Sequence, residues 1–180
     1  MVARPASEPA PSFETLYEEH VDFVWRYAAT HGIAPAQLDD VVQEVFLVVH
    51  ARLASFERRS GVKTWIAGIA VNVVRGFRRR RRNRQLGEPI EELESFRSPE
   101  GTACDALELK RTLQLLDRAL AQMAELPREA FVLCDLEQLP QVEVAAMLGV
   151  NENTLRARLR TARLIVKEVA GSAAPGGGSP

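Results

Sequence analysis

The sequence predicts an all-α protein, with two small helical domains joined by a flexible acidic linker and a helix-turn-helix in the C-terminal domain. Three observations support this fold class. Apolar residues recur at helical spacing along most of the 180 residues. Residues 86–104 break the pattern with Pro89, Pro99 and Gly101, scattered acids and no apolar period. A tight turn at residues 149–151 separates two amphipathic segments.

The first predicted helix follows Ser12, a residue type that caps helices, and ends at Gly32. Its acidic side chains fall on one side and its apolar side chains on the other. The apolar face is predicted to bury Leu16, Tyr17, Val21, Val24 and Ala28.

The second predicted helix begins near Pro35 and extends to about residue 53. Its many β-branched residues are also compatible with a strand. A helix is favoured because the run exceeds ten residues and its polar members cluster on one side. The side chains predicted to be buried are Leu38, Val41, Val42, Val45, Val49 and Leu53.

The third predicted helix runs from about residue 64 to residue 82 and ends in a block of arginines. The C-terminal domain is predicted to hold helices at about 105–123, from Pro127, at 141–148 and, capped by Asn151, at 152–169. The predicted domains are therefore 12–85 and 105–170, with a linker at 86–104 and a disordered tail at 171–180 rich in glycine and proline.

The formal net charge of −1 hides an uneven distribution of charge. Residues 75–84 carry seven arginines and no acid, and residues 153–167 carry five basic residues and no acid. Residues 1–57 carry nine acids against three arginines, and residues 88–108 carry seven acids against one arginine. Near neutrality therefore does not exclude a nucleic-acid partner.

Several function classes find no support in the sequence. No apolar run approaches the roughly 18 residues of a membrane helix, and residues 1–12 lack the apolar core of a signal peptide. Two cysteines 30 residues apart make no disulfide framework, so we expect a cytoplasmic protein. The three histidines are scattered, and no zinc spacing, phosphate loop or nucleophile elbow occurs. We therefore expect no enzyme activity, metal or cofactor.

The helix after the turn at 149–151 is the strongest candidate for a DNA-reading element. Its apolar stripe faces inward and leaves arginines outside, as in a recognition helix that enters the major groove. The alternative is a solvated basic helix in a helical hairpin. The outward-facing residues are Asn153, Arg156, Arg160 and Arg163.

Three features of the N-terminal domain have both functional and structural interpretations. The arginine block contacts nucleic-acid phosphates, or it is a solvated helix end or a patch for an acidic protein. One helix face carries Asp40, Gln43 and Glu44. It binds a basic partner, or it is an ordinary solvent-exposed face. Trp65 stacks on an unpaired base or belongs to the core.

Ordered segments of the chain resemble the extracytoplasmic-function sigma factors of bacterial RNA polymerase. Residues 39–46 (DDVVQEVF) are similar to their polymerase-binding helix. Residues 65–72 (WIAGIAVN), followed by basic residues, are similar to their promoter-melting helix. Residues 126–133, 143–145, 148–150 and 154–163 resemble their second conserved domain.

The resemblance implies a protein without catalytic activity that docks on the beta-prime and beta subunits of core RNA polymerase. The first domain, sigma region two, would read and open the minus-ten element, and the second, sigma region four, would read the minus-thirty-five element. An anti-sigma factor, often membrane-bound, would hold the protein inactive.

The resemblance also assigns site residues. The polymerase-binding residues implied are Asp39, Asp40, Gln43 and Glu44. Those implied for minus-ten DNA are Lys63, Trp65, Asn72, Arg75, Arg78, Arg79 and Arg82. Those implied for minus-thirty-five DNA are Asn153, Thr154, Arg156, Arg158, Arg160 and Arg163.

Two other function classes compete with this interpretation. A stand-alone helix-turn-helix regulator would bind duplex operator DNA without polymerase. An inhibitory adaptor that sequesters another protein would tolerate loss of Arg156 and Arg160.

Overall fold

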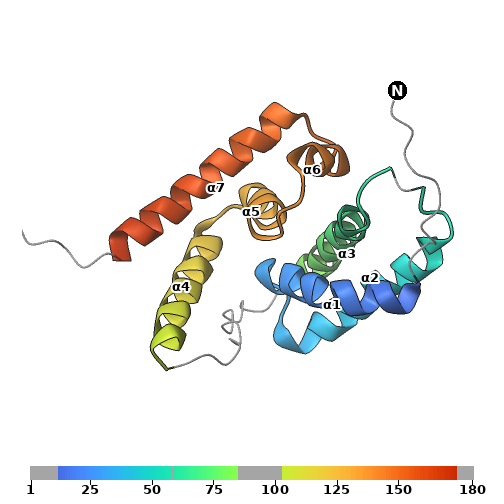
Figure 1. Ribbon diagram of the computed structural model, residues 1–180, viewed down its shortest axis with the longest axis horizontal. Helices are drawn as coiled ribbons and strands as arrows, with labels where there is room; N and C mark the ends of the chain where they lie inside the picture. The colour runs from blue at the N-terminus through green and yellow to red at the C-terminus, as the bar shows by residue number, and fades with distance from the viewer. Residues whose placement is uncertain (1–11, 58, 85–102, 174–180) are drawn as a thin grey trace, which may run out of the picture.

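The computed structural model describes residues 12–57, 59–84 and 103–173, and all regular structure in these ranges is helical. This confirms the all-α prediction and excludes the strand alternative for the second element. The elements in chain order (Figure 1) are α1 (Phe13–Thr30), α2 (Pro35–Leu53), α3 (Val62–Arg84), α4 (Ala103–Gln122), α5 (Glu125–Phe131), the π-helix η1 (Val132–Leu136), α6 (Gln141–Leu148) and α7 (Glu152–Ala173).

Helices α1, α2 and α3 pack around one apolar core. Ser12 caps α1 as expected, because its Oγ accepts a hydrogen bond of 3.2 Å from the Thr15 amide. Most of the predicted apolar face of α1 is buried, but Tyr17 remains 42% exposed. The prediction missed Phe23 and Tyr27, which are buried because α1 is covered on a second flank by α3 and by residues of α5.

Helix α2 follows the prediction closely. Pro35 opens it, and the predicted residues from Leu38 to Val49 are buried, whereas Leu53 is only half-buried. Helix α3 is longer at both ends than expected. Its apolar face, from Ile66 to Val74, packs on the first two helices, and its C-terminal turns carry the arginine block.

The C-terminal half is built on α7, which packs against α4, α5 and α6. Gly149 ends α6 with a left-handed backbone (φ +67°), a conformation that glycine adopts without steric cost. Asn151 then caps α7, since its Oδ1 accepts a 2.8 Å hydrogen bond from the Thr154 amide. The turn of the predicted helix-turn-helix therefore lies where it was expected.

The structure also changes predicted boundaries in the C-terminal half, where α5 begins at Glu125 rather than at Pro127. Helix α7 ends at Ala173 rather than near Val169, so residues 171–173 are helical and do not belong to a disordered tail. Helix α4 begins at Ala103, inside the predicted linker. The remainder of that linker and residues 174–180 lie outside the described residues.

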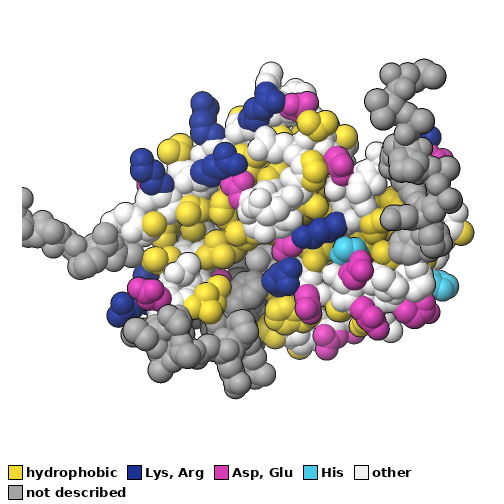
Figure 2. Space-filling model, in the orientation of Figure 1, with side chains coloured by type: hydrophobic (Ala, Val, Ile, Leu, Met, Phe, Trp, Pro, Cys, Tyr) yellow, Lys and Arg dark blue, Asp and Glu magenta, His cyan; other side chains and the backbone are white. Residues whose placement is uncertain are grey.

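The two halves of the molecule lie against each other. Helix α6 and the segment from α5 to η1 face α3 and α1 (Figure 1). At Gly68 of α3 the approach is so close that a β-carbon there would come within 3.1 Å of Met147 Cγ. The surface charge remains divided, with basic side chains over α7 and acidic side chains over α1 and α2 (Figure 2).

Candidate functional site

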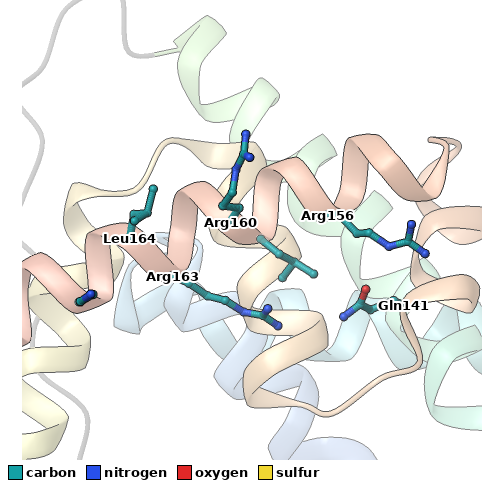
Figure 3. Close-up of a pocket in the computed structure, with 7 residues that line it drawn as sticks. Gln141, Arg156, Arg160, Arg163 and Leu164 are labelled. Atoms are coloured by element: carbon teal, nitrogen blue, oxygen red, sulfur yellow. The ribbon is translucent and has the colours of Figure 1, made fainter.

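Helix α7 presents its basic side chains to solvent along one face. Leu155, Leu159 and Ala162 are buried against the rest of the domain, which leaves Arg156 and Arg160 exposed. Figure 3 shows Arg156 on the side of α7 nearest Gln141, while Arg160 extends from the opposite edge. A hollow of about 280 Å³ lies along these side chains.

The predicted DNA-binding residues of α7 differ in exposure and in whether an acidic side chain already binds them. The Arg163 guanidinium is held by two hydrogen bonds from Nε and Nη2 to the Asp135 carboxylate, of 2.8 and 2.7 Å. Arg156 Nη2 lies 2.6 Å from Glu152 Oε2 within the same helix. Asn153 is exposed, and Thr154 and Arg158 are half-buried. Arg163 is thus tied to η1, and Arg160 makes no ion pair with any described residue.

The π-helix η1 positions the side chains between α5 and α6. Asp135, in η1, pairs with Arg163, and Glu137 follows directly and points to α3. The chain then turns through Gln138, the one non-glycine residue with positive φ (+56°) among those described. A π-turn widens the helical spacing, and such turns are frequent at functional sites.

The predicted polymerase-binding residues share one face of α2. Asp39, Asp40 and Gln43 are exposed, and the two aspartates form no ion pair within the described ranges. Glu44 is half-buried, and its Oε2 lies 3.0 Å from Arg80 Nη2 of α3. Three of the four side chains are therefore free to meet a partner.

An apolar groove that the sequence did not reveal lies beside these residues. It has a volume of about 680 Å³ between α1 and α2. Its walls include the partly exposed rings of Tyr17 and Trp25 and the side chain of Leu47, which is 64% exposed. The helical period alone assigned Tyr17 to the core. In the structure its ring packs on Phe46 of α2, with centroids 4.7 Å apart, and lines the open groove.

The residues implied for minus-ten DNA lie along α3 and do not share one environment. Trp65 is half-buried, and its ring packs on Phe56 with centroids 4.6 Å apart. Asn72 is exposed and donates a 2.9 Å hydrogen bond from Nδ2 to the Gly68 carbonyl. A cavity of about 500 Å³ borders both side chains, and residues of α6, among them Val142 and Met147, also line it. Arg79 and Arg82 are exposed.

The remaining three basic residues of this set are engaged by acids of the other domain. Lys63 Nζ lies 2.8 Å from Glu137 Oε2. Arg78 Nη1 lies 2.8 Å from Glu125 Oε1. Arg75 donates from Nη2 and Nε to the two oxygens of Glu129, at 2.6 and 3.0 Å.

Sequence reasoning missed these acidic partners. Glu129 is 1% exposed and lies in an apolar stretch, where an unpaired carboxylate would be costly. The signal in the sequence was an acid next to an apolar run, but its basic partner lies 54 residues away in the chain. The Tyr27 hydroxyl also donates to Glu129 Oε1 at 3.4 Å, and burial raises the pKa of Tyr27 well above its usual value.

The described residues show no cluster of metal ligands, and the environment of Cys134 does not activate its thiol. Within them, no three His, Cys, Asp or Glu side chains gather as metal ligands would. Burial raises the pKa of the Cys134 thiol to about 11, which disfavours a reactive thiolate. In the same ranges, no helix combines the length and the hydropathy that crossing a membrane requires.

Comparison with known families matches both halves of the chain. Residues 16–84 match Sigma-70 region 2, and residues 113–165 match Sigma-70, region 4. The ECF RNA polymerase sigma factor SigL of Mycobacterium tuberculosis is 28% identical over 174 residues, which cover 93% of this chain and 96% of SigL. The RNA polymerase sigma factor CnrH of Cupriavidus metallidurans is 28% identical over 173 residues, covering 91% of this chain and 88% of CnrH.

Two solved structures share the fold. The sigma factor RpoE of Bartonella quintana, solved with the anti-sigma factor NepR, superposes with a TM-score of 0.73 at 22% identity, covering 89% of this chain and 98% of that one. CnrH, solved with the cytosolic domain of CnrY, gives a TM-score of 0.62 at 24% identity, covering 90% and 89%. Region 2 precedes region 4 in the chain. The relatives that match most of the chain are themselves RNA polymerase sigma factors. The chain therefore belongs to the extracytoplasmic-function sigma factors of bacterial RNA polymerase.

Proposed function

We propose that this sigma factor divides promoter recognition between its two halves, with residues 12–85 serving as region two and residues 105–170 as region four. The exposed recognition helix is the observation that carries this proposal. As a sigma factor, the chain directs core RNA polymerase to promoters and is not an enzyme. Region two is assigned the minus-ten element and region four the minus-thirty-five element.

The polymerase-binding face is assigned to Asp39, Asp40, Gln43 and Glu44 of α2. The exposed acids favour a basic partner. The adjacent groove adds apolar surface that is exposed to solvent in the isolated domain and that a partner would bury. Leu47, at the edge of this groove, is the largest exposed apolar contribution. We assign the whole face to the core subunits of the polymerase.

The minus-ten residues are assigned to α3 and the turn before it. An aromatic ring, an exposed amide and a run of arginines form the combination that holds an unpaired strand, through stacking, base edges and phosphates. Trp65 supplies the ring, Asn72 the amide, and Arg79 and Arg82 the exposed positive charge. Lys63, Arg75 and Arg78 continue this basic line toward the other domain.

The minus-thirty-five residues are assigned to α7. Arg156 and Arg160 are exposed one turn apart and have the planar donor fork that reads guanine in the major groove. Asn153 and Thr154 lie at the N-terminus of the same helix, where recognition helices contact bases. Arg163, held by Asp135, is assigned a supporting role together with Arg158.

Control by an anti-sigma factor is part of the proposal. The relatives RpoE and CnrH have been solved with the anti-sigma factor NepR and with the cytosolic domain of CnrY. This chain has the same fold, and we assign it the same kind of partner and a cytoplasmic location. The apolar groove and the acidic face of α2 give such a partner a surface shared with the polymerase.

In vitro transcription tests the proposal most directly. Purified core polymerase is assayed on the genomic region upstream of the gene for this chain, with and without the protein. We expect initiation only when both are present. Footprinting of an operator by the chain alone, with no initiation in the presence of core, would instead establish a stand-alone regulator.

A further inference from the structure

One acidic side chain stands among the basic residues of the recognition helix. Glu152, the first residue of α7, is the only acid between Asn151 and Lys167. Its side chain is 45% exposed, and the residues on either side of it are exposed as well. Because DNA phosphates repel a carboxylate, an acid at this place on a DNA-reading helix calls for a specific role.

The Glu152 carboxylate binds the arginine one turn further along the helix. Its Oε2 accepts a 2.6 Å hydrogen bond from Arg156 Nη2, and Asn153 Oδ1 accepts one of 3.3 Å from Nη1 of the same guanidinium. Each terminal nitrogen of a guanidinium carries two hydrogens, so Arg156 keeps a pair of donors for a base edge. The ion pair therefore offsets the negative charge of Glu152 and leaves Arg156 able to read DNA.

The second oxygen of the Glu152 carboxylate is available to a ligand. In the part of the chain that the structure describes, no hydrogen bond reaches Glu152 Oε1. The neighbouring Asn151 differs, because its Oδ1 is already used on the Thr154 amide at 2.8 Å. The first turn of α7 thus offers a free acceptor next to the donors of Arg156.

This order of acceptor and donors matches two adjacent base pairs. In the major groove, cytosine presents a donor, its N4 amino group, and guanine presents two acceptors, N7 and O6. The first residues of a recognition helix contact base edges, and side chains three or four residues apart contact successive bases. Glu152 and Arg156 are four residues apart, so an acceptor and a donor fork reach neighbouring pairs.

We infer that Glu152 is a specificity-determining residue, whose free carboxylate oxygen accepts a hydrogen bond from N4 of a cytosine in the base pair next to the guanine that Arg156 reads. This inference rests on the proposed minus-thirty-five role of α7. An acid in the first turn also stabilises a helix through its dipole, but that effect is indifferent to the DNA sequence. A change in base preference therefore distinguishes the two roles.

Transcription by the complete holoenzyme tests this preference. The template is the genomic promoter region with its minus-thirty-five element randomised, and a barcode in each transcript identifies the element that was used. Glu152→Gln keeps the size of the side chain, removes its charge and supplies an amide that pairs with adenine. Glu168→Gln, an exposed acid near the other end of α7, is the matched control.

We expect the parent to prefer cytosine to adenine about tenfold at one position beside the guanine. Glu152→Gln should shift this preference to adenine, Glu152→Ala should lose it, and the control should keep it. An unchanged preference in Glu152→Gln overturns the inference. So does a uniform loss at every position, which indicates a structural role, or a change at the guanine alone, which indicates that Glu152 only positions Arg156.

Arg156→Ala separates this result from the proposed function. Loss of the guanine preference in that variant supports α7 as the reading helix, whatever Glu152→Gln does at the neighbouring position. If Arg156→Ala keeps every base preference of the parent, the minus-thirty-five assignment of α7 itself fails.

Discussion

Glu129 of α5 receives two hydrogen bonds from the Arg75 guanidinium of α3, one of 2.6 Å and one of 3.0 Å, across the boundary between the two domains. The Glu129 side chain is almost fully buried, and the Arg75 side chain is 39% exposed. A residue expected to grip promoter phosphate is thus held by an acid of the same chain. The pair links the fold of the free protein to the availability of its DNA-binding surface.

A disulfide across the domain boundary should lock the docked state. Gly68→Cys/Met147→Cys, in a chain with Cys104→Ser and Cys134→Ala, brings two thiols together where a β-carbon at 68 lies 3.1 Å from Met147 Cγ. Met147 Cβ is one bond beyond this Cγ, which puts the two β-carbons near the upper end of the roughly 3.5–4.5 Å found in disulfides, so oxidation by diamide should cross-link the pair. We expect the oxidised protein to lose single-strand binding, measured by fluorescence anisotropy with a labelled DNA. Reduction should restore binding, and equal binding in both forms would contradict occlusion of α3 by α6.

The exposed arginines of α7 should determine use of the minus-thirty-five element. Arg156→Ala and Arg160→Ala each remove a donor fork worth about 1–3 kcal/mol at a base pair, so transcription should fall roughly tenfold or more for each. The double variant should abolish it. Arg118→Ala, an exposed arginine of α4, is the charge-matched control. Full transcription by the double variant would exclude α7 as the reading helix.

Leu47 should affect polymerase binding without affecting stability. Its side chain is 64% exposed, so Leu47→Ala removes little buried area and should leave the urea midpoint unchanged. On docking, the same side chain would be buried, and its truncation should weaken the affinity for core polymerase several-fold. Asp40→Ala/Gln43→Ala should act in the same direction, and Glu168→Ala should not. A pull-down titration with purified core distinguishes these outcomes.

His31 should make the protein less stable in mild acid. Burial lowers the pKa of its imidazole to about 4 from an ordinary 6.5, although Nδ1 donates to the Tyr27 carbonyl at 2.8 Å. Between these values the unfolded chain binds the extra proton, so stability is complete above pH 6.5 and falls as the pH drops toward 4. The loss approaches about 3 kcal/mol near pH 4. Urea unfolding of His31→Gln should show a shallower pH slope than the parent, and identical slopes would refute the assignment.

Gln138 should be a site where glycine is favoured over alanine. Its φ of +56° lies in the left-handed region, which costs about 1 kcal/mol for a residue with a β-carbon. Gln138→Gly relieves this strain but loses the side-chain hydrogen bond to the Asp135 carbonyl, so its free energy of unfolding should exceed that of Gln138→Ala by about 1 kcal/mol. Gln138→Ala keeps the strain and loses the side-chain hydrogen bond to the Asp135 carbonyl, so it should be no more stable than the parent. Calorimetry of the three proteins decides between these outcomes.

Local patterns were sufficient for most of the fold. The bounds of α2 and α6, the cap at Asn151 and the turn at Gly149 depend on nearest neighbours in the chain, and they agree with the structure. The exposed arginines of α7 follow from the same helical period. Errors arose where a second element determines burial, as at Tyr17 and Phe23 of α1.

The sequence by itself determined two helical domains, a helix-turn-helix and the division of charge into acidic and basic blocks. Only the tertiary structure decided that Glu129 and Glu137 meet Arg75 and Lys63, because these residues lie 54 and 74 positions apart and no local period relates them. The charge blocks in the sequence predict which surfaces attract one another. The packing of α5 and η1 against α3 decides which carboxylate pairs with which basic side chain. That packing exists only in the folded chain.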